Sequence, residues 1–253
     1  MGFDAATMSL FSSPLYFAPN TIALWLCWPQ EISEPSLLAQ YESVLTHDET
    51  QRKNRFHFHK HRHLYLVTRA MEKTLLARYS GIHLKQLTCL RNAYGKPYLC
   101  QNGIHPLLYY NLSHTDDLIV MALSKGCELG VDVESTHRIV CREEIVRSYF
   151  AKSETDDIQK QATEKEKNIR FYQYWTLKEA YIKALGKGIG SNLESIHFDL
   201  TDSKKIKHTD ENNLDNTLWQ HYLFTTEKGH SIALVLDSRE KLKVNMRTMI
   251  PMR

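Results

Sequence analysis

Long hydrophobic runs are absent from this chain of 253 residues, and no segment approaches the roughly 20 apolar residues that a membrane-spanning helix needs. The first twenty residues also lack a basic start followed by an apolar run. Ala6 stands where a myristoylation signal requires Ser or Thr. We therefore expect no secretion signal, no lipid anchor and no membrane partner.

Cysteine pairs and strong charge are also missing. The five cysteines are far apart, odd in number and never arranged as Cys-x-x-Cys, which favours reduced thiols in the cytoplasm over a disulfide framework. The net charge is only +3, with basic and acidic residues scattered along the chain, and this argues against a nucleic-acid-binding protein. The remaining composition is that of an ordinary protein with a sizeable core.

The first half of the chain carries signals for a strand, a long helix and further strands. The apolar stretch 21–28 predicts a buried strand, and Thr46 with Glu49 has the spacing of a helix-starting capping box. Apolar residues then recur at helical steps, so we predict one long helix that stops near Gly81. A turn at 92–96 and polar residues at 113–117 separate the strands that follow.

The second half repeats this order. A strand at 129–134 is followed by helical structure over 142–186, with a charged loop at 160–168, and then by three strands. We therefore predict an α+β fold of two similar subdomains, residues 1–129 and 130–253, with a ligand cleft between them. The basic segment 239–253 is expected to fray.

Two carboxylates share one face of the strand at 129–134. Asp132 and Glu134 alternate with apolar residues, so both side chains point the same way. They form either a solvated strand face or a pair that converges on a hard cation. A bare Asp-x-Glu pair is more typical of the first alternative, and Gly130 weakens that alternative slightly, because a missing side chain lets another part of the molecule approach the backbone.

A second candidate lies in the predicted helix around residues 174–188. Glu179 and Lys183 are one turn apart, opposite the core stripe of the helix, and would ordinarily form an exposed ion pair. Trp175 and Ile182 lie on that same side, so the helix is apolar on two sides. Such a helix is usually wedged between layers, and a ligand cleft explains the charges as well as open water does.

Three further segments carry polar side chains that suit anions. Ser113 and His114 occupy a corner between two strands, either as a hydrogen-bonded turn or as an anion site. Arg91 and Lys96 flank a glycine turn that is either a phosphate grip or a soluble loop. The histidines of 57–63 have metal-compatible spacing, but no nearby Cys or acid completes a set, which favours surface histidines.

Five motifs occur in one order along the chain. They are RNAYGKP at 91–97, YNLSHT at 110–115, GVDVE at 130–134, SYFAKSE at 148–154 and WTLKEAYIKALGKG at 175–188. Together they resemble the surfactin-synthetase-activating type of 4'-phosphopantetheinyl transferase. The family patterns G-x-D-x-E and W-x-x-K-E-x-x-x-K both stand here without substitution, and the matching blocks run from about Arg52 to Gly188.

The resemblance implies two similar α+β subdomains related by a pseudo-twofold axis, with coenzyme A bound between them. It implies transfer of the 4'-phosphopantetheine arm of coenzyme A to a serine of an apo acyl or peptidyl carrier protein, with release of adenosine 3',5'-bisphosphate. Asp132, Glu134 and Glu179 would hold magnesium, with manganese as a substitute. Glu179, as the base, and Lys183 would be the catalytic residues. Coenzyme A would contact Arg52, Arg91, Lys96, Asn111, Ser113, His114, Asp132 and Lys183.

Several points stay open at this stage. The carrier protein could serve fatty-acid, polyketide or nonribosomal-peptide synthesis. An inactive coenzyme A-binding module and a magnesium-dependent diphosphate hydrolase are alternative functions, and the intact Glu179 and Lys183 argue against the first. Many relatives have Asp where His61 precedes Arg62, so Arg62 is given no role. We expect a cytoplasmic monomer with no nucleic-acid partner.

Overall fold

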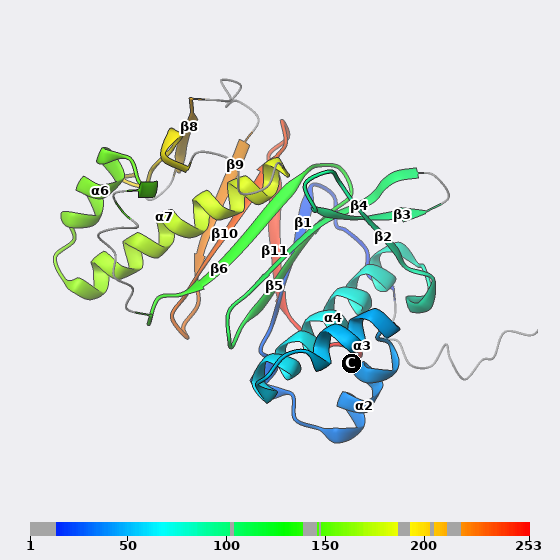
Figure 1. Ribbon diagram of the computed structural model, residues 1–253. Coiled ribbons are helices and arrows are strands. Elements are labelled where there is room, and N and C mark those ends of the chain that lie inside the picture. The colour runs from blue at the N-terminus through cyan, green and yellow to red at the C-terminus, as the bar shows by residue number, and fades with distance from the viewer. Residues whose placement is uncertain are drawn as a thin grey trace, which may run out of the picture.

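The molecule is built in four layers, with two β-sheets between two long helices (Figure 1). The computed structural model describes residues 14–101, 104–138, 146, 148–186, 193–202, 205–211 and 219–253. Ala6 and Gly188 lie outside these residues. None of the helices in the described part of the chain is long and apolar enough to cross a membrane.

Helices and strands come in separate runs along the chain, which confirms the predicted α+β class. The first ten are β1 (Thr21–Cys27), η1 (Pro29–Glu31), α2 (Pro35–Ser43), α3 (His47–Asn54), α4 (His59–Ser80), η2 (Leu84–Gln86), β2 (Thr88–Arg91), β3 (Pro97–Gln101), β4 (Ile104–His114) and β5 (Ile119–Ser124). The remaining elements are β6 (Leu129–Ser135), α6 (Lys152–Gln159), α7 (Glu164–Leu185), η3 (Leu193–Ser195), β7 (Ile196–Asp199), β8 (Lys207–Asp210), β9 (Trp219–Thr225), β10 (His230–Asp237) and β11 (Lys243–Thr248).

The two main sheets pack face to face. The larger sheet has the order β11-β1-β5-β4-β3-β2, and the smaller one has the order β6-β10-β9. One apolar cluster lies between them, with residues such as Leu24 of β1 and Val131 of β6 fully buried. A second cluster joins α4 to the outer face of the larger sheet, and a third joins α7 to the outer face of the smaller one. Because successive side chains of a strand point to opposite faces, every second residue of β1 and β6 lies in the core between the two sheets.

The predicted long helix of the first half is in fact two helices. The capping box at Thr46 and Glu49 is present and starts α3, and Gly81 ends α4 in the left-handed conformation, as expected. Between them the backbone turns extended at Phe58. The guanidinium of Arg62 donates to the carbonyl oxygens of residues 56 and 57, which satisfies backbone acceptors at the break. The Arg62 side chain therefore has a structural role in this turn.

The helical region of the second half also differs from the prediction at its start. The prediction of a charged loop at 160–168 is wrong beyond residue 163. Thr163 and Glu166 form a capping box, and α7 begins at Glu164. The short helix α2 and the strands β2, β8 and β11 were not predicted from periodicity.

The basic C-terminal segment does not fray. Residues 243–248 form β11, which pairs in parallel with β1 at the edge of the larger sheet. Beyond the strand, the Met249 N–H donates to the Leu26 carbonyl, and the Tyr41 hydroxyl donates to the Pro251 carbonyl. The last strand of the second half therefore completes the sheet of the first. The pseudo-twofold axis and the division at residue 129 stay predictions.

Candidate active site

Strand β6 and helix α7 pack with their backbones in unusually close contact at Gly130. A methyl group built on Gly130 would lie 2.0 Å from the carbonyl oxygen of Ala180 and 2.4 Å from the nitrogen of Ala184. Only glycine fits there, so the approach expected at this residue is made by the backbone of α7. Glu179 and Lys183, which flank these alanines, are thereby held against β6.

Ser113, Asp132 and Lys183 meet in one set of hydrogen bonds. The Ser113 hydroxyl on β4 donates to Oδ1 of Asp132 on β6 at 2.8 Å. The ammonium of Lys183 on α7 donates to the same Oδ1 at 2.5 Å and to the Ser113 hydroxyl oxygen at 3.0 Å. Three motifs that are far apart in the sequence thus converge at one carboxylate.

The second carboxylate oxygen of Asp132 is unpaired within the described part of the chain. Asp132 is only 4% exposed, and its Oδ2 is buried without a hydrogen bond from any described residue. Such an atom is costly in the unliganded protein, because a buried carboxylate oxygen has lost its contact with water. An orphaned oxygen beside a bound ammonium group suits a cation that would complete its coordination.

Glu134 and Glu179 adjoin this carboxylate and are electrostatically coupled to it. Burial, followed by the charge of Asp132, raises the pKa of Glu134 to about 7. The same two causes, in the same order, raise the pKa of Glu179, and Lys183 offsets part of this increase. The three carboxylates therefore repel one another, so a bound cation or proton would stabilise the group.

The carboxylates around Asp132 suit magnesium better than they suit a metal ion whose ligands all come from the protein. Within the residues that the structure describes, no three His, Cys, Asp or Glu side chains form a ready-made metal cage. Magnesium usually binds through one or two carboxylates plus phosphate oxygens and waters, so it does not require such a cage. Asp132, with its free oxygen, and the glutamates Glu134 and Glu179 are the carboxylates that would supply the protein share.

Lys178 and Trp175 of the same motif hold α7 in place. Lys178 and Glu154 of α6 form an ion pair at 2.9 Å in which both side chains are fully buried. The Lys178 ammonium also donates to the carbonyl oxygens of Leu193 and Ile196. Trp175 stacks on the rings of Phe150 and Phe171 at 6.4 and 6.3 Å, so an aromatic cluster packs against this side of the helix. These residues fix the helix that carries Glu179.

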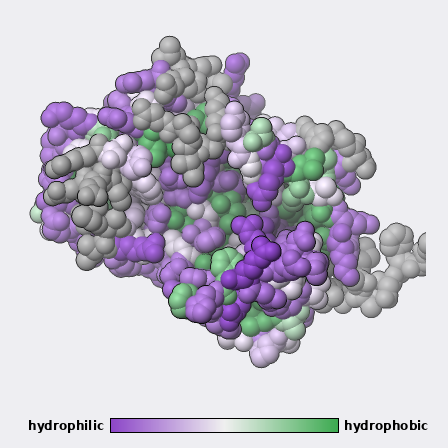
Figure 2. Space-filling model, in the orientation of Figure 1, coloured by the Kyte–Doolittle hydropathy of each residue, from purple (hydrophilic) through white to green (hydrophobic). Residues whose placement is uncertain are grey.

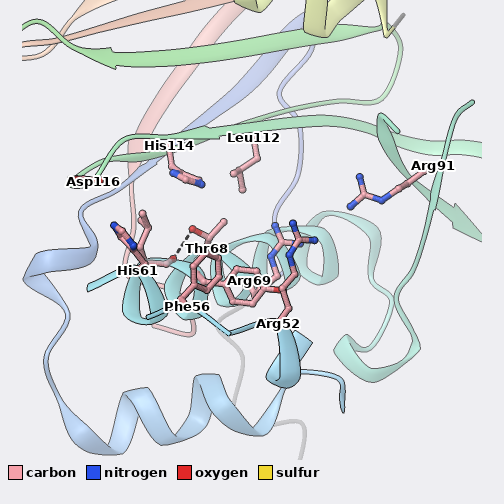
Figure 3. Close-up of a pocket in the computed structure, with 11 residues that line it drawn as sticks. Arg52, Phe56, His61, Thr68, Arg69, Arg91, Leu112, His114 and Asp116 are labelled. Carbon is pink, nitrogen blue, oxygen red and sulfur yellow. Dashed lines mark hydrogen bonds between the residues drawn. The ribbon is translucent and has the colours of Figure 1, made fainter. Parts of the chain in front are cut away.

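A cationic pocket with a volume of about 500 Å³ lies between α3, α4 and the ends of β2 and β4. Arg52 at the end of α3, Arg91 at the end of β2 and His114 at the end of β4 line it. Figure 3 shows the Arg91 side chain reaching toward the pocket from the right and the Arg52 side chain rising from the helices below. Figure 2 shows strongly hydrophilic side chains beside a hollow in this part of the surface.

His114 links the pocket to the carboxylate site, since Ser113 is its neighbour. Desolvation by the surrounding chain lowers the pKa of His114, although the ring stays partly open to water, and the charges of Lys183 and Arg69 act in the same direction. The imidazole is therefore predominantly neutral at neutral pH, and serves as a hydrogen-bonding group instead of a fixed charge.

Two predicted ligand-binding residues have structural partners. The side-chain oxygen of Asn111 accepts a hydrogen bond from the Val131 N–H at 2.9 Å, which ties β4 to β6. The ammonium of Lys96 donates to the Ala184 carbonyl at 2.9 Å and pairs with Glu128, away from the arginine pocket. Burial lowers the pKa of Lys96 despite this pairing. Both residues join the two halves of the chain.

Sequence reasoning missed Arg69, which also lines the pocket. Its signal was present, because Arg69 and Glu72 stand three residues apart on a helix, a spacing that permits an ion pair. The histidines of 57–63 form no metal site among the described residues. His63 donates instead to the Pro29 carbonyl oxygen at 2.8 Å, and its ring stacks on His59.

Comparison with known proteins identifies the family. The family model described as "4'-phosphopantetheinyl transferase superfamily" matches residues 128–235, and "4'-phosphopantetheinyl transferase, N-terminal" matches residues 31–126. The 4'-phosphopantetheinyl transferase HetI of Nostoc sp. is 32% identical over 181 residues, which are 71% of this chain and 76% of that protein. The chain belongs to the 4'-phosphopantetheinyl transferase superfamily.

Other similar proteins agree with this assignment. The 4'-phosphopantetheinyl transferase pptA of Paxillus involutus is 30% identical to this transferase over 200 residues, 72% of this chain and 74% of that protein. A solved holo-(acyl-carrier-protein) synthase from Bacillus anthracis, in complex with CoA, covers 43% of this chain and 93% of its own, at 20% identity and a TM-score of 0.36. That likeness is too weak to define the fold.

Proposed function

We propose that this transferase moves the 4'-phosphopantetheine arm of coenzyme A to a serine hydroxyl of an apo acyl or peptidyl carrier protein and releases adenosine 3',5'-bisphosphate. The convergence of Ser113, Asp132 and Lys183, with one Asp132 oxygen left unpaired, carries the proposal. Phosphoryl-type transfer needs little more than positioning and charge stabilisation, and this arrangement can supply both.

Each residue near Asp132 has a separate task in this reaction. The serine oxygen of the carrier attacks the phosphorus that bears the pantetheine arm, and the bond from that phosphorus to the adenosine-side phosphate oxygen breaks. Glu179 takes the serine proton, directly or through a water. Burial and the charge of Asp132 raise the pKa of Glu179 in the protein without a bound cation. Lys183 stabilises the negative charge that collects on the leaving phosphate.

Magnesium is the cation that we propose for the carboxylates. When bound, it would neutralise diphosphate charge. Asp132 would bind it through the oxygen that lacks a hydrogen bond, with Glu134 and Glu179 as the further ligands. Manganese also prefers oxygen ligands in octahedral sites and should substitute for it.

The arginine pocket would receive the other end of coenzyme A. Arg52, Arg91 and His114 offer donors for its phosphates, and Ser113 connects this pocket to the carboxylates. We propose that the cleft lies between the halves 1–129 and 130–253 and that a pseudo-twofold axis relates these halves. We also propose that the enzyme belongs to the surfactin-synthetase-activating type. Asn111 and Lys96 would act there indirectly, through the contacts that join the halves. We expect a cytoplasmic monomer.

One assay tests the transfer. The protein is incubated with coenzyme A, magnesium and purified apo carrier proteins from fatty-acid, polyketide and nonribosomal-peptide synthesis, and each carrier is weighed by mass spectrometry. We expect at least one carrier to gain the mass of one phosphopantetheine group. No gain on any carrier would refute the proposal.

Controls in the same assay separate the alternative functions. Cleavage of coenzyme A without a carrier would identify a diphosphate hydrolase, and binding without cleavage or transfer would identify an inactive coenzyme A-binding module. Glu179→Gln should bind coenzyme A and remain folded but should not label the carrier. Near-normal labelling by this variant would exclude Glu179 as the base.

A further inference from the structure

His230 is a buried histidine outside both the carboxylate site and the arginine pocket. It lies at the start of β10, the middle strand of the smaller sheet, and its side chain is 0% exposed. Its Nε2 donates to Oδ1 of Asp117 at 2.9 Å, because a carboxylate can only accept. Asp117 belongs to the β4–β5 turn, residues 115–118, which directly follows Ser113 and His114. The contact therefore joins the smaller sheet to the corner that carries two site residues.

The imidazole of His230 is anchored on its other side by the β9–β10 turn, residues 226–229. Its Nδ1 lies 3.2 Å from the hydroxyl oxygen of Thr226, which also accepts a hydrogen bond from the His230 N–H. The ring of Trp28 meets the imidazole nearly edge-on, with 5.4 Å between the ring centres. Figure 1 shows this turn and the β4–β5 turn at the same end of the two sheets. The imidazole is thus a fixed point to which Asp117 is bound.

Asp117 transmits this constraint to the β4–β5 turn. Its Oδ1 also accepts a hydrogen bond from the Thr115 hydroxyl at 2.8 Å, and the Thr115 N–H donates to the Leu118 carbonyl oxygen across the turn. Partial burial would raise the pKa of Asp117, but the hydrogen bonds from His230 and Thr115 bring this pKa below its ordinary value. The carboxylate is therefore ionised at neutral pH, and its hydrogen bonds are charge-assisted.

A row of side-chain hydrogen bonds joins β4 and the turn after it to the smaller sheet. The row consists of Asn111 with the Val131 N–H, Ser113 with Asp132, and Asp117 with His230. In the proposed reaction Ser113 and Lys183 serve the diphosphate, so their hydrogen bonds to Asp132 weaken when coenzyme A binds. The His230 contact uses no group that the ligand needs, and it can hold the corner in place during this exchange.

We propose that His230 is a positioning residue for the transfer, because through Asp117 it holds the β4–β5 turn, and with it Ser113 and His114, against the smaller sheet. The inference rests on the proposed function and adds to it a residue that touches neither coenzyme A nor magnesium. Since β10 pairs with β6, the bridge fixes the Ser113 hydroxyl relative to Asp132. The effect of His230 on the reaction should therefore pass through Ser113.

The test measures whether His230 acts through Ser113. His230→Phe keeps an aromatic ring beside Trp28 but removes the donor to Asp117, and it should lower kcat/KM for coenzyme A in carrier labelling by about 10-fold. In a Ser113→Ala background the same change should lower kcat/KM by less than about 3-fold, because the hydroxyl that it positions is gone. His230→Gln, whose amide can donate in place of Nε2, should recover part of the loss when Ser113 is present.

A control variant changes the same β9–β10 turn without affecting the corner. Lys228 forms an exposed ion pair with Glu31 at 2.7 Å, and Lys228→Met should leave kcat/KM unchanged. If His230→Phe fails to fold, Asp117→Ala removes the same hydrogen bond from its partly exposed side and should show the same dependence on Ser113. Equal losses with and without the Ser113 hydroxyl, or no loss at all, would overturn the inference, because a residue with only a structural role acts independently of Ser113.

A binding measurement separates this inference from the transfer reaction. Calorimetry with coenzyme A and magnesium should show weaker binding in His230→Phe and in Ser113→Ala, and little further loss in the double variant. If this pattern holds while no carrier is labelled, the transfer proposal fails and His230 still positions the coenzyme A site. If carriers are labelled, and His230→Phe binds and labels like the wild type, the His230 assignment fails alone.

Discussion

Gly130→Ala is the sharpest test of how the site is assembled. The added methyl group would lie 2.0 Å from the Ala180 carbonyl oxygen, whereas real contacts of this kind stay beyond 3.0 Å. Helix α7 must therefore retreat from β6 by about 1 Å, because the obstructing atoms are backbone atoms inside a close-packed core.

The expected effect on stability follows from this overlap. Overpacking lowers the free energy of unfolding by about 1 to 3 kcal/mol. Alanine also reduces the conformational entropy of the unfolded chain at this position, which offsets less than about 1 kcal/mol of that loss. For a chain of this length the melting temperature should fall by about 2 to 10 °C. Transfer should fall by about 100-fold, since the shift separates Lys183 and Glu179 from Asp132 by an amount that disrupts catalytic positioning.

Thermal unfolding and carrier labelling measure the two effects on the same preparation. Gly126→Ala is the matched control, because a methyl group there meets no atom within 4 Å, and it should change stability by less than about 0.5 kcal/mol. If Gly130→Ala melted like the wild type and labelled carriers at the same rate, close packing of β6 on α7 would not be what aligns the site.

Three further predictions concern other contacts. Lys178→Met should lower the free energy of unfolding in chemical denaturation by about 3 to 5 kcal/mol, because Glu154 stays fully buried without its ion-pair partner. The double variant Lys178→Met/Glu154→Gln should recover part of that loss, and a cost of Lys178→Met below about 1 kcal/mol would contradict a structural role. Burial lowers the pKa of His208 to about 4 and of His221 to about 3. As the pH falls below 6.5, both imidazoles are therefore protonated in the unfolded chain before they are protonated in the folded protein. The free energy of unfolding should be highest above pH 6.5 and should fall by about 2 to 4 kcal/mol by pH 5. The double variant His208→Phe/His221→Leu should flatten that slope, and an unchanged slope would assign it to other groups. Asp132→Asn should raise the magnesium concentration needed for half-maximal labelling or abolish labelling, whereas unchanged magnesium dependence would place the metal elsewhere.

The parts of the site that a single element fixes could be predicted from the sequence. Strand alternation put Asp132 and Glu134 on one face, and helical spacing put Glu179 one turn before Lys183, because these relations depend only on local geometry. The repeated order of strand and helix signals also predicted the α+β class. The roles assigned to these residues in catalysis and metal binding stay predictions.

The parts that depend on packing between elements could not be predicted in this way. The contact of Lys183 with Asp132 depends on how α7 lies across β6, which no local pattern encodes. The break before α4 depends on Arg62, whose guanidinium reaches back to two carbonyl groups. The spacing of Arg69 and Glu72 indicates an ion pair, but no local pattern places Arg69 in a pocket, because Tyr110 of a distant strand contacts Glu72 there.

Strand β11 has a consequence for how the protein is made. It is joined to β10 by only five residues, yet it pairs with β1, at the opposite end of the chain. One edge of β1 therefore stays open during translation until residues 243–248 have emerged from the ribosome. Fragments separated between the halves should recover a complete first sheet only when the second fragment donates this strand, and until then the open edge offers a template for exchange between chains.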